Sequence, residues 1–188
     1  MLWTGAVPAG PPPGPVELLL EVSEDPDFQQ LLLREKLQAD PASDYTVRAY
    51  VDEMQPDWTY YYRFRGGEHS VSRSGRTRTA PASGQSPRVN LAFASCQNYE
   101  QAYYGAWARM IADDQAAPET ERIHFVLHLG DFIYERLWDQ QPGGDPQPRR
   151  LPDFPDGVSS EKNRRAVTLA DYRHLYKRVL EDPHLQAA

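Results

Sequence analysis

The sequence predicts a fold in two parts: a β-sandwich over residues 1–80 and, after a short linker, a partial α/β domain over residues 88–188. Three observations predict it. The first part contains runs of aromatic and β-branched residues, which are typical of strands. Residues 81–87 are small and polar and include proline, as expected of a linker. Beyond them the pattern changes to strand, helix, strand, which indicates a βαβ unit.

The first part is predicted to be all-β. The run VELLLEV, residues 16–22, indicates a buried strand. The segments YTVRAYVDE, from Tyr45, and TYYYRFR, from Thr59, indicate two more. Gly66 and Gly67 then predict a turn into a strand that ends near SGRTRT. These segments together predict one small antiparallel β domain.

One tyrosine suggests the type of sandwich. The stretch MQPDWTY ends at Tyr60 and resembles the tyrosine corner of fibronectin- and immunoglobulin-like sandwiches, in which the hydroxyl bonds the backbone a few residues upstream. The alternative is that Tyr60 is simply one of three strand tyrosines. A complete sandwich needs about seven strands, more than can be counted here, and Leu2 and Trp3 resemble the middle of a strand. We therefore expect an incomplete sandwich that lacks its first strand.

Composition excludes several function classes. The net charge is -7, and the 20 Lys and Arg are dispersed, so the basic patch of a nucleic-acid-binding protein is missing. The sequence contains no apolar run of the roughly 18 residues that a membrane helix needs, so no membrane insertion is expected. A GxSxG nucleophile elbow and Gly-rich phosphate loops are also missing. A single cysteine excludes an internal disulfide and leaves the compartment open.

In the second part, RVNLAFAS and IHFVLHLG indicate two strands, and YYGAWARMIADD between them indicates a helix. The Pro-, Gly- and Asp-rich residues 138–160 predict a loop, in which Asp139, Asp145, Asp153 and Asp156 are expected to face water. Thr168 and Asp171 predict a capping box at the start of a last helix. The apolar faces are predicted to hold Tyr104, Trp107, Ala108 and Ile111 in the first helix and Tyr172, Leu175, Tyr176 and Val179 in the second.

Two candidate site residues follow the two strands of the βαβ unit. Because this crossover makes the strands parallel, their carboxyl ends lie at the same sheet edge, where α/β proteins hold ligands. Cys96 follows the first strand and Asp131 the second, after Gly130, which permits a sharp turn. Tyr134 and Glu135 come just beyond. A thiolate, a carboxylate and a phenolate together suit a trivalent or strongly Lewis-acidic metal, such as iron.

Simpler interpretations stay open for each residue. A lone cysteine is usually a buried, inert side chain. Asp131 alone could be a turn or cap residue, and Tyr134 could pack or bond locally. His124 and His128 share one face of the second strand and could suggest another metal site. We prefer the interpretation that both are hydrogen-bonded near the sheet.

Three segments, RVNLAFASCQ, FVLHLGDFIYE and VTLADYRHLYKRVLEDPHLQAA, resemble the alkaline phosphatase D (PhoD-like) family of metallophosphatases. LWTGAVP, EVSEDPDF, YTVRAYVDEMQPDWTYYYRF and GRTRTAP are similar to that family's N-terminal β-sandwich. The resemblance implies hydrolysis of a small phosphoester, monoester or diester, by a hydroxide that iron and calcium activate. It also implies Cys96 as a thiolate ligand to iron, Asp131 as the carboxylate bridging both metals and Tyr134 as a phenolate ligand to iron. Glu135 matches the motif without an assigned role.

The sequence departs from the family at its C-terminal end. Family members continue into a segment with Asp, His and Asn residues and later His and Asp ligands, and these positions have no counterpart here. We therefore expect a truncated metallophosphatase domain in a fragment that is inactive alone. The resemblance makes a periplasmic or extracellular location plausible. The competing hypothesis is a non-catalytic binding module with a remnant of a phosphatase domain.

Overall fold

The structure is a computed structural model that describes the chain apart from residues 7–9, 11–13, 102, 138–148, 152 and 161–162. The chain divides into two compact units, Met1–Arg88 and Val89–Ala188. Among the described residues, no helix is both long and apolar enough to cross a membrane.

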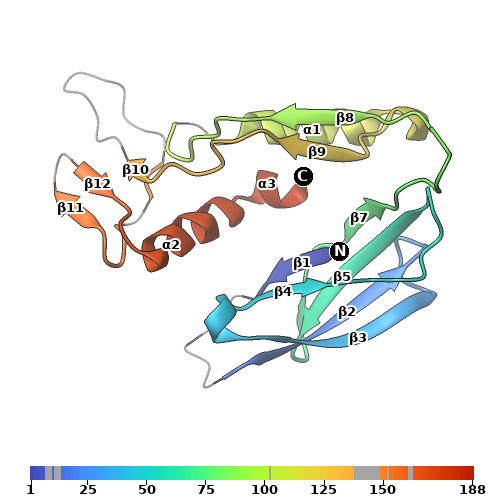
Figure 1. The fold of residues 1–188 in the computed structure, drawn as a ribbon, viewed down its shortest axis with the longest axis horizontal. Coiled ribbons are helices and arrows are strands. Elements are labelled where there is room, and N and C mark those ends of the chain that lie inside the picture. Colours follow the sequence, from blue (N-terminus) through green and yellow to red (C-terminus); the bar gives the residue numbers. More distant parts are fainter. Residues whose placement is uncertain (7–9, 11–13, 102, 138–148, 152, 161–162) are drawn as a thin grey trace. The chain divides into compact units, whose positions relative to one another are not determined.

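The first unit is built from two antiparallel sheets (Figure 1). In the smaller sheet β1 (Leu2–Gly5) pairs with β4 (Thr46–Ala49). In the larger sheet the order is β3-β2-β5-β6, with β7 also paired to β5. Its strands are β2 (Val16–Ser23), β3 (Leu31–Ala39), β5 (Thr59–Gly66), β6 (Ser70–Val71) and β7 (Gly75–Arg78). A short 3₁₀ helix, η1 (Pro41–Ser43), connects β3 to β4.

Both sheets contribute to one hydrophobic core, so the unit is sandwich-like. Leu2 and Ala49 from the smaller sheet pack in a cluster with Leu20, Val22, Tyr60 and Phe64 from the larger one. Alternate residues of the strands point inward, as a half-buried sheet requires. The Tyr60 ring is 1% exposed, and its hydroxyl accepts a hydrogen bond of 2.8 Å from the Gln55 N–H. The predicted bond from Tyr60 to the backbone upstream is therefore confirmed.

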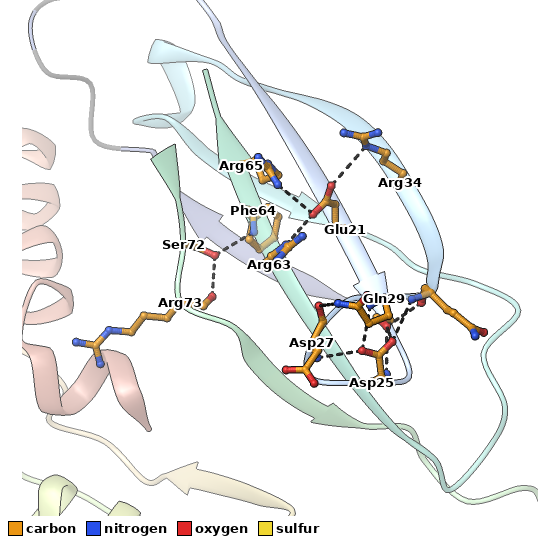
Figure 2. A network of polar contacts seen from close by, with 12 residues as sticks. Glu21, Asp25, Asp27, Gln29, Arg34, Arg63, Phe64, Arg65, Ser72 and Arg73 are labelled. Atoms are coloured by element: carbon orange, nitrogen blue, oxygen red, sulfur yellow. Dashed lines mark hydrogen bonds and ion pairs between the residues drawn. The ribbon is translucent and has the colours of Figure 1, made fainter. Parts of the chain in front are cut away.

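The other face of the larger sheet carries a buried carboxylate. Glu21 of β2 lies directly opposite Arg34 of β3 and Arg63 of β5. Its oxygens lie 3.5 Å from Arg34 Nε, 2.6 Å from Arg63 Nε and 3.9 Å from Arg65 Nη1 (Figure 2). The Glu21 side chain is only 3% exposed. Three guanidinium groups offset the cost of removing this charge from water, and they tie three strands together.

The β2–β3 connection turns around Asp25. Its carboxylate accepts hydrogen bonds from the backbone N–H groups of Asp27, Gln29 and Gln30 and from the Ser23 hydroxyl (Figure 2). The Gln29 N–H contributes most, and together these bonds lower the pKa of Asp25 to about 2. The carboxylate therefore holds the turn closed across the neutral pH range.

The second unit begins with the predicted βαβ arrangement. β8 (Leu91–Ala94) and β9 (Phe125–His128) pair in parallel, and α1 (Gly105–Ala116) connects them, followed by the short 3₁₀ helix η2 (Glu119–Glu121). Trp107 of α1 packs in a buried cluster with Tyr104 and Val179, against Ala94 and Val126 of the two strands. The parallel pairing is thereby confirmed. Of the predicted helix face, Tyr104 and Trp107 are buried, whereas Ala108 and Ile111 are only partly buried.

A small antiparallel sheet and two helices complete the second unit. Its strand order is β10-β12-β11, and the strands are β10 (Arg136–Leu137), β11 (Val158–Ser160) and β12 (Asn163–Arg165). The helices are α2 (Leu169–Leu180) and α3 (Pro183–Ala187). Leu175 and Val179 of α2 are buried, as predicted, whereas Tyr172 and Tyr176 are 39% and 46% exposed. The buried face of α2 is therefore narrower than the sequence predicts.

The capping box at the start of α2 is confirmed. Thr168 Oγ1 accepts from the Asp171 N–H, and Asp171 Oδ2 accepts in return from the Thr168 N–H. Burial alone would raise the pKa of Asp171, but the N–H groups of Val167, Asp156 and Thr168 lower it on balance. Asp171 therefore stays ionised at neutral pH and binds three backbone donors.

Two predicted boundaries are wrong, and one strand of the first unit is missing from the prediction. The strand expected from Tyr45 to Glu53 ends at Ala49, because the chain turns there and Glu53 has a left-handed φ of 59°. β3 was not predicted at all. The loop expected over 138–160 includes β11 at its end, while residues 138–148, with Asp139 and Asp145, lie outside the described part of the chain.

Candidate functional site

The carboxyl ends of β8 and β9 bring the two predicted site segments together. The strand pairing continues past both strand ends: the Cys96 N–H donates to the Gly130 carbonyl at 3.1 Å. One residue further, the Gln97 N–H donates to the Asp131 carbonyl, also at 3.1 Å. Cys96 and Asp131, far apart in the sequence, are therefore neighbours at one sheet edge, as predicted.

Both residues have an unusual backbone conformation. Cys96 has φ 58° and Asp131 has φ 53°, in the left-handed region that residues with a Cβ rarely adopt. Gly130 precedes Asp131 with φ 134°, a value that suits glycine. Each non-glycine residue in such a region costs about 1–3 kcal/mol, and such strain clusters at functional sites. The turns expose both residues at the end of the sheet.

The exposure of Cys96 tests the interpretation of a buried cysteine. A buried Cys96 would act as a small apolar side chain, but the thiol is exposed at the strand end. The interpretation of a buried cysteine is therefore wrong. The exposed thiol is accessible from solvent at the sheet edge.

Tyr134 joins these two side chains. Its hydroxyl donates to Asp131 Oδ2 at 3.2 Å. Partial desolvation, followed by the interactions with the Asp131 carboxylate and the Cys96 side chain, raises the pKa of the Tyr134 phenol. Without a cation the phenol thus keeps its proton and shares it with Asp131. The predicted trio of thiol, carboxylate and phenol is brought together in space.

Comparisons with known proteins identify the family of this chain. The family described as "PhoD-like phosphatase, N-terminal domain" matches residues 1–81, and the family described as "PhoD-like phosphatase" matches residues 91–188. The chain belongs to the PhoD-like phosphatase family.

One curated relative and one solved structure show how much of the family's length this PhoD-like chain spans. Alkaline phosphatase D of Bacillus subtilis (strain 168) is 32% identical over 194 residues, which cover 100% of this chain and 30% of the relative. A solved structure of PhoD, 31% identical, matches with a TM-score of 0.76 over 98% of this chain and 33% of its own. The chain therefore spans about a third of the length of these relatives.

His124 and His128, at opposite ends of β9, have local partners in this PhoD-like chain. His124 Nδ1 accepts from the Asn90 N–H, and His128 Nδ1 accepts from the Gly130 N–H, both at 3.4 Å. The His128 ring also stacks on Trp107, with ring centroids 6.4 Å apart. Both therefore fit the preferred interpretation of histidines that are hydrogen-bonded near the sheet. Within the described residues, no three His, Cys, Asp or Glu side chains form a group that could hold a metal ion.

Sequence reasoning missed two buried polar residues beside the cysteine. Gln97 is 8% exposed and Glu100 is 5% exposed, and both make side-chain hydrogen bonds. Glu135, which matched the family motif, is exposed, and its carbonyl accepts from the Ala166 N–H at 2.8 Å. The polar composition of SCQNYE directly after a strand was the available signal, because buried polar groups need assigned partners.

Proposed function

We propose that this chain contributes part of the catalytic site of a metal-dependent phosphoester hydrolase that acts on small monoesters or diesters. The observation that carries the proposal is the convergence of Cys96, Asp131 and Tyr134 at the ends of two parallel strands. Membership of the PhoD-like family supports the reaction type. The sheet edge is the part of an α/β fold at which ligands are held.

The three side chains fit iron and calcium by their chemistry. In this proposal the Cys96 thiolate and the Tyr134 phenolate would hold iron, and the Asp131 carboxylate would bind both iron and calcium. A soft thiolate favours iron over calcium, whereas carboxylate oxygens suit both ions. When bound, the metal ions would neutralise phosphate charge and lower the pKa of a water molecule for attack on phosphorus.

The chain's own residues set the positions of the proposed metal ligands and hold the proton of Tyr134. The left-handed turns at Cys96 and Asp131 direct two exposed side chains to one edge. The Tyr134 hydroxyl donates its proton in a hydrogen bond to Asp131 Oδ2. When the phenol loses that proton, both oxygen atoms become available to bind a metal ion. Because the raised pKa of Tyr134 opposes this loss, binding through the phenolate should strengthen as pH rises.

The architecture proposed for the complete site goes beyond these three residues. We propose that the second unit is part of a metallophosphatase domain, and that the first unit is a fibronectin- or immunoglobulin-like sandwich, supported by the Tyr60 hydrogen bond. Three donors fill only part of a coordination shell, so slow or no hydrolysis is expected from these 188 residues alone. A periplasmic or extracellular location is proposed from the family resemblance.

A second candidate is a non-catalytic binding module. One observation favours it: the described residues contain no group of three His, Cys, Asp or Glu side chains suited to a metal ion. In that case the strand-end residues would be a remnant of a phosphatase site, and the sandwich would bind a partner.

Metal binding separates the two candidates. The chain is mixed with ferric iron and calcium, and visible absorption is recorded. We expect a charge-transfer band that weakens in Cys96→Ser and changes in Tyr134→Phe. Tyr172→Phe, at an exposed tyrosine of α2, is the matched control and should leave the band unchanged. A colourless wild type that retains no iron would reject the metal site and favour the binding module.

Hydrolysis is tested on the complete product of the gene that encodes this segment. p-Nitrophenyl phosphate and bis(p-nitrophenyl) phosphate serve as monoester and diester probes. We expect the complete product to hydrolyse these probes and Asp131→Asn to lower turnover by at least about 100-fold. Losing a residue that supports a metal ligand costs up to about 100-fold, and losing the ligand itself should cost at least as much. Full activity in Asp131→Asn would contradict the proposed role of this carboxylate.

A further inference from the structure

The side chain of Gln97 connects the two turns of the candidate site with α1. Its Nε2 donates to the Phe132 carbonyl at 3.2 Å, and its Oε1 accepts from Trp107 Nε1 at 3.1 Å. Its backbone N–H donates to the Asp131 carbonyl. We propose that Gln97 is a positioning residue that holds the Asp131 turn against the Cys96 turn.

The need for such a residue follows from the backbone conformation of the site. Cys96 and Asp131 are exposed and left-handed, and strained conformations persist only where the surroundings enforce them. Metal ligands must also be held within about 0.5 Å of their binding geometry. Gln97 follows Cys96 directly and binds Asp131 and the next residue, Phe132. One residue therefore fixes both sides of the site.

The chemistry of the position requires an amide. The Trp107 indole N–H can only donate and the Phe132 carbonyl can only accept, so a single orientation of the Gln97 amide satisfies both. Gln97 and Trp107 are each 8% exposed, so an unpaired group at either would be poorly solvated. A methionine of similar length would fill the space without either bond. Gln97 thus meets a polar requirement that an apolar residue could not meet.

Trp107 supplies the rigid support. It lies in the first turn of α1, within a buried cluster that includes Tyr104 and Val179, and it stacks on His128 of β9. Through its indole, Gln97 is therefore linked to the packed core of the second unit. The two exposed turns of the site are in this way linked to a buried, packed cluster.

The inference rests on the proposed function for its metal readout, and a second readout needs no metal. Gln97→Met is compared with wild type and with Gln115→Met, a matched control at an exposed position of α1. Amide hydrogen exchange is followed at Cys96 and Gln97 in the metal-free chain. We expect Gln97→Met to raise exchange at these two amides at least about tenfold, with the Leu129 amide, bonded to the Ala94 carbonyl, little changed.

Metal affinity is then measured by titrating ferric iron and following the charge-transfer band. We expect Gln97→Met to weaken binding about 10–100-fold, the range for residues that orient metal ligands, whereas Gln115→Met should match wild type. Unchanged exchange at both amides, or faster exchange with unchanged iron affinity, would overturn the inference.

Two further results, a wild type that binds no iron and a variant that does not fold, are interpreted as follows. If the wild type binds no iron, the proposed function fails, and the exchange data alone decide whether Gln97 holds the turns. If Gln97→Met does not fold, Trp107→Phe replaces it, since that change removes the indole donor and keeps an aromatic ring in the buried cluster. Faster exchange at the Cys96 and Gln97 amides in Trp107→Phe supports the inference, and unchanged exchange overturns it.

Discussion

Replacing Arg164 with methionine should destabilise the second unit strongly. Arg164 of β12 is 3% exposed, and its Nη2 donates to Glu100 Oε1 at 3.0 Å while its Nη1 donates to the Leu151 carbonyl at 2.8 Å. The same Glu100 oxygen accepts from the Leu151 N–H at 2.8 Å. Methionine keeps most of the apolar stem but removes the charge. The Glu100 carboxylate would then be buried without its cationic partner.

The size of the loss follows from burial. Removing one partner of a buried ion pair costs about 3–5 kcal/mol, because the remaining charge is neither hydrated nor compensated. An exposed pair gives a matched control: Arg109 and Asp113 of α1 are 79% and 60% exposed, and such a pair contributes about 0.3–0.5 kcal/mol. Arg164→Met should therefore cost several times more free energy of unfolding than Arg109→Met.

Urea denaturation of the two variants and wild type measures this difference, with intrinsic fluorescence as the signal. A double variant, Glu100→Gln with Arg164→Met, also removes the unpaired Glu100 charge. It should regain at least about 1 kcal/mol of unfolding free energy relative to Arg164→Met alone. A loss below about 1 kcal/mol in Arg164→Met would refute the reasoning. A double variant no more stable than the single one would refute it as well.

Two smaller effects are expected elsewhere. Tyr60→Phe removes the hydroxyl that accepts from the Gln55 N–H and should cost about 1 kcal/mol of unfolding free energy, measured by urea denaturation. Asp171→Asn should lower stability at neutral pH and flatten its pH dependence. The folded pKa of Asp171 is below its ordinary 3.8, so its contribution is full above that value and is lost as pH falls through the folded pKa. Denaturation series from pH 7 to about pH 2 check this, and parallel curves for variant and wild type would contradict it.

The elements that local pattern alone can specify were predictable. β2 is a largely apolar run and β5 is a run rich in aromatic residues, and their bounds in the structure differ by about a residue from those predicted. The capping box at Thr168 and Asp171 depends on two residues three apart, so its signal is also local. Right-handed βαβ connections make neighbouring strands parallel, and the pairing of β8 with β9 followed from that rule.

β3 was not predictable in the same way. Its sequence, LLLREKLQA, consists largely of residues that favour helices, and their alternation is weak. The segment forms a strand because Leu33 and Leu37 pack on the core of the first unit while Arg34 pairs with Glu21 across to β2. Tertiary pairing therefore outweighed local propensity, and a single sequence does not display that pairing.

The candidate site also has features that the sequence predicts and features that depend on tertiary packing. The neighbourhood of Cys96 and Asp131 follows from topology, and the structure confirms that they are adjacent. Their left-handed conformations, and the hydrogen bond between Tyr134 and Asp131, depend on how each turn packs. The partners of Gln97 are Trp107 and Phe132, which local spacing in the sequence does not connect with it.

The polar segment after the cysteine has a physical reason. A thiol exposed at a strand end requires the chain to leave the sheet, and the turn that follows has backbone groups that must find partners. Gln97 and Glu100 supply anchors on either side of the turn, one to the Trp107 indole and the Phe132 carbonyl, the other to Arg164. Apolar residues at these positions could bury area but could not fix the direction of the backbone. Holding Cys96 exposed and strained therefore depends on buried polar groups next to it, so the stability of this segment and the geometry of the candidate site should change together.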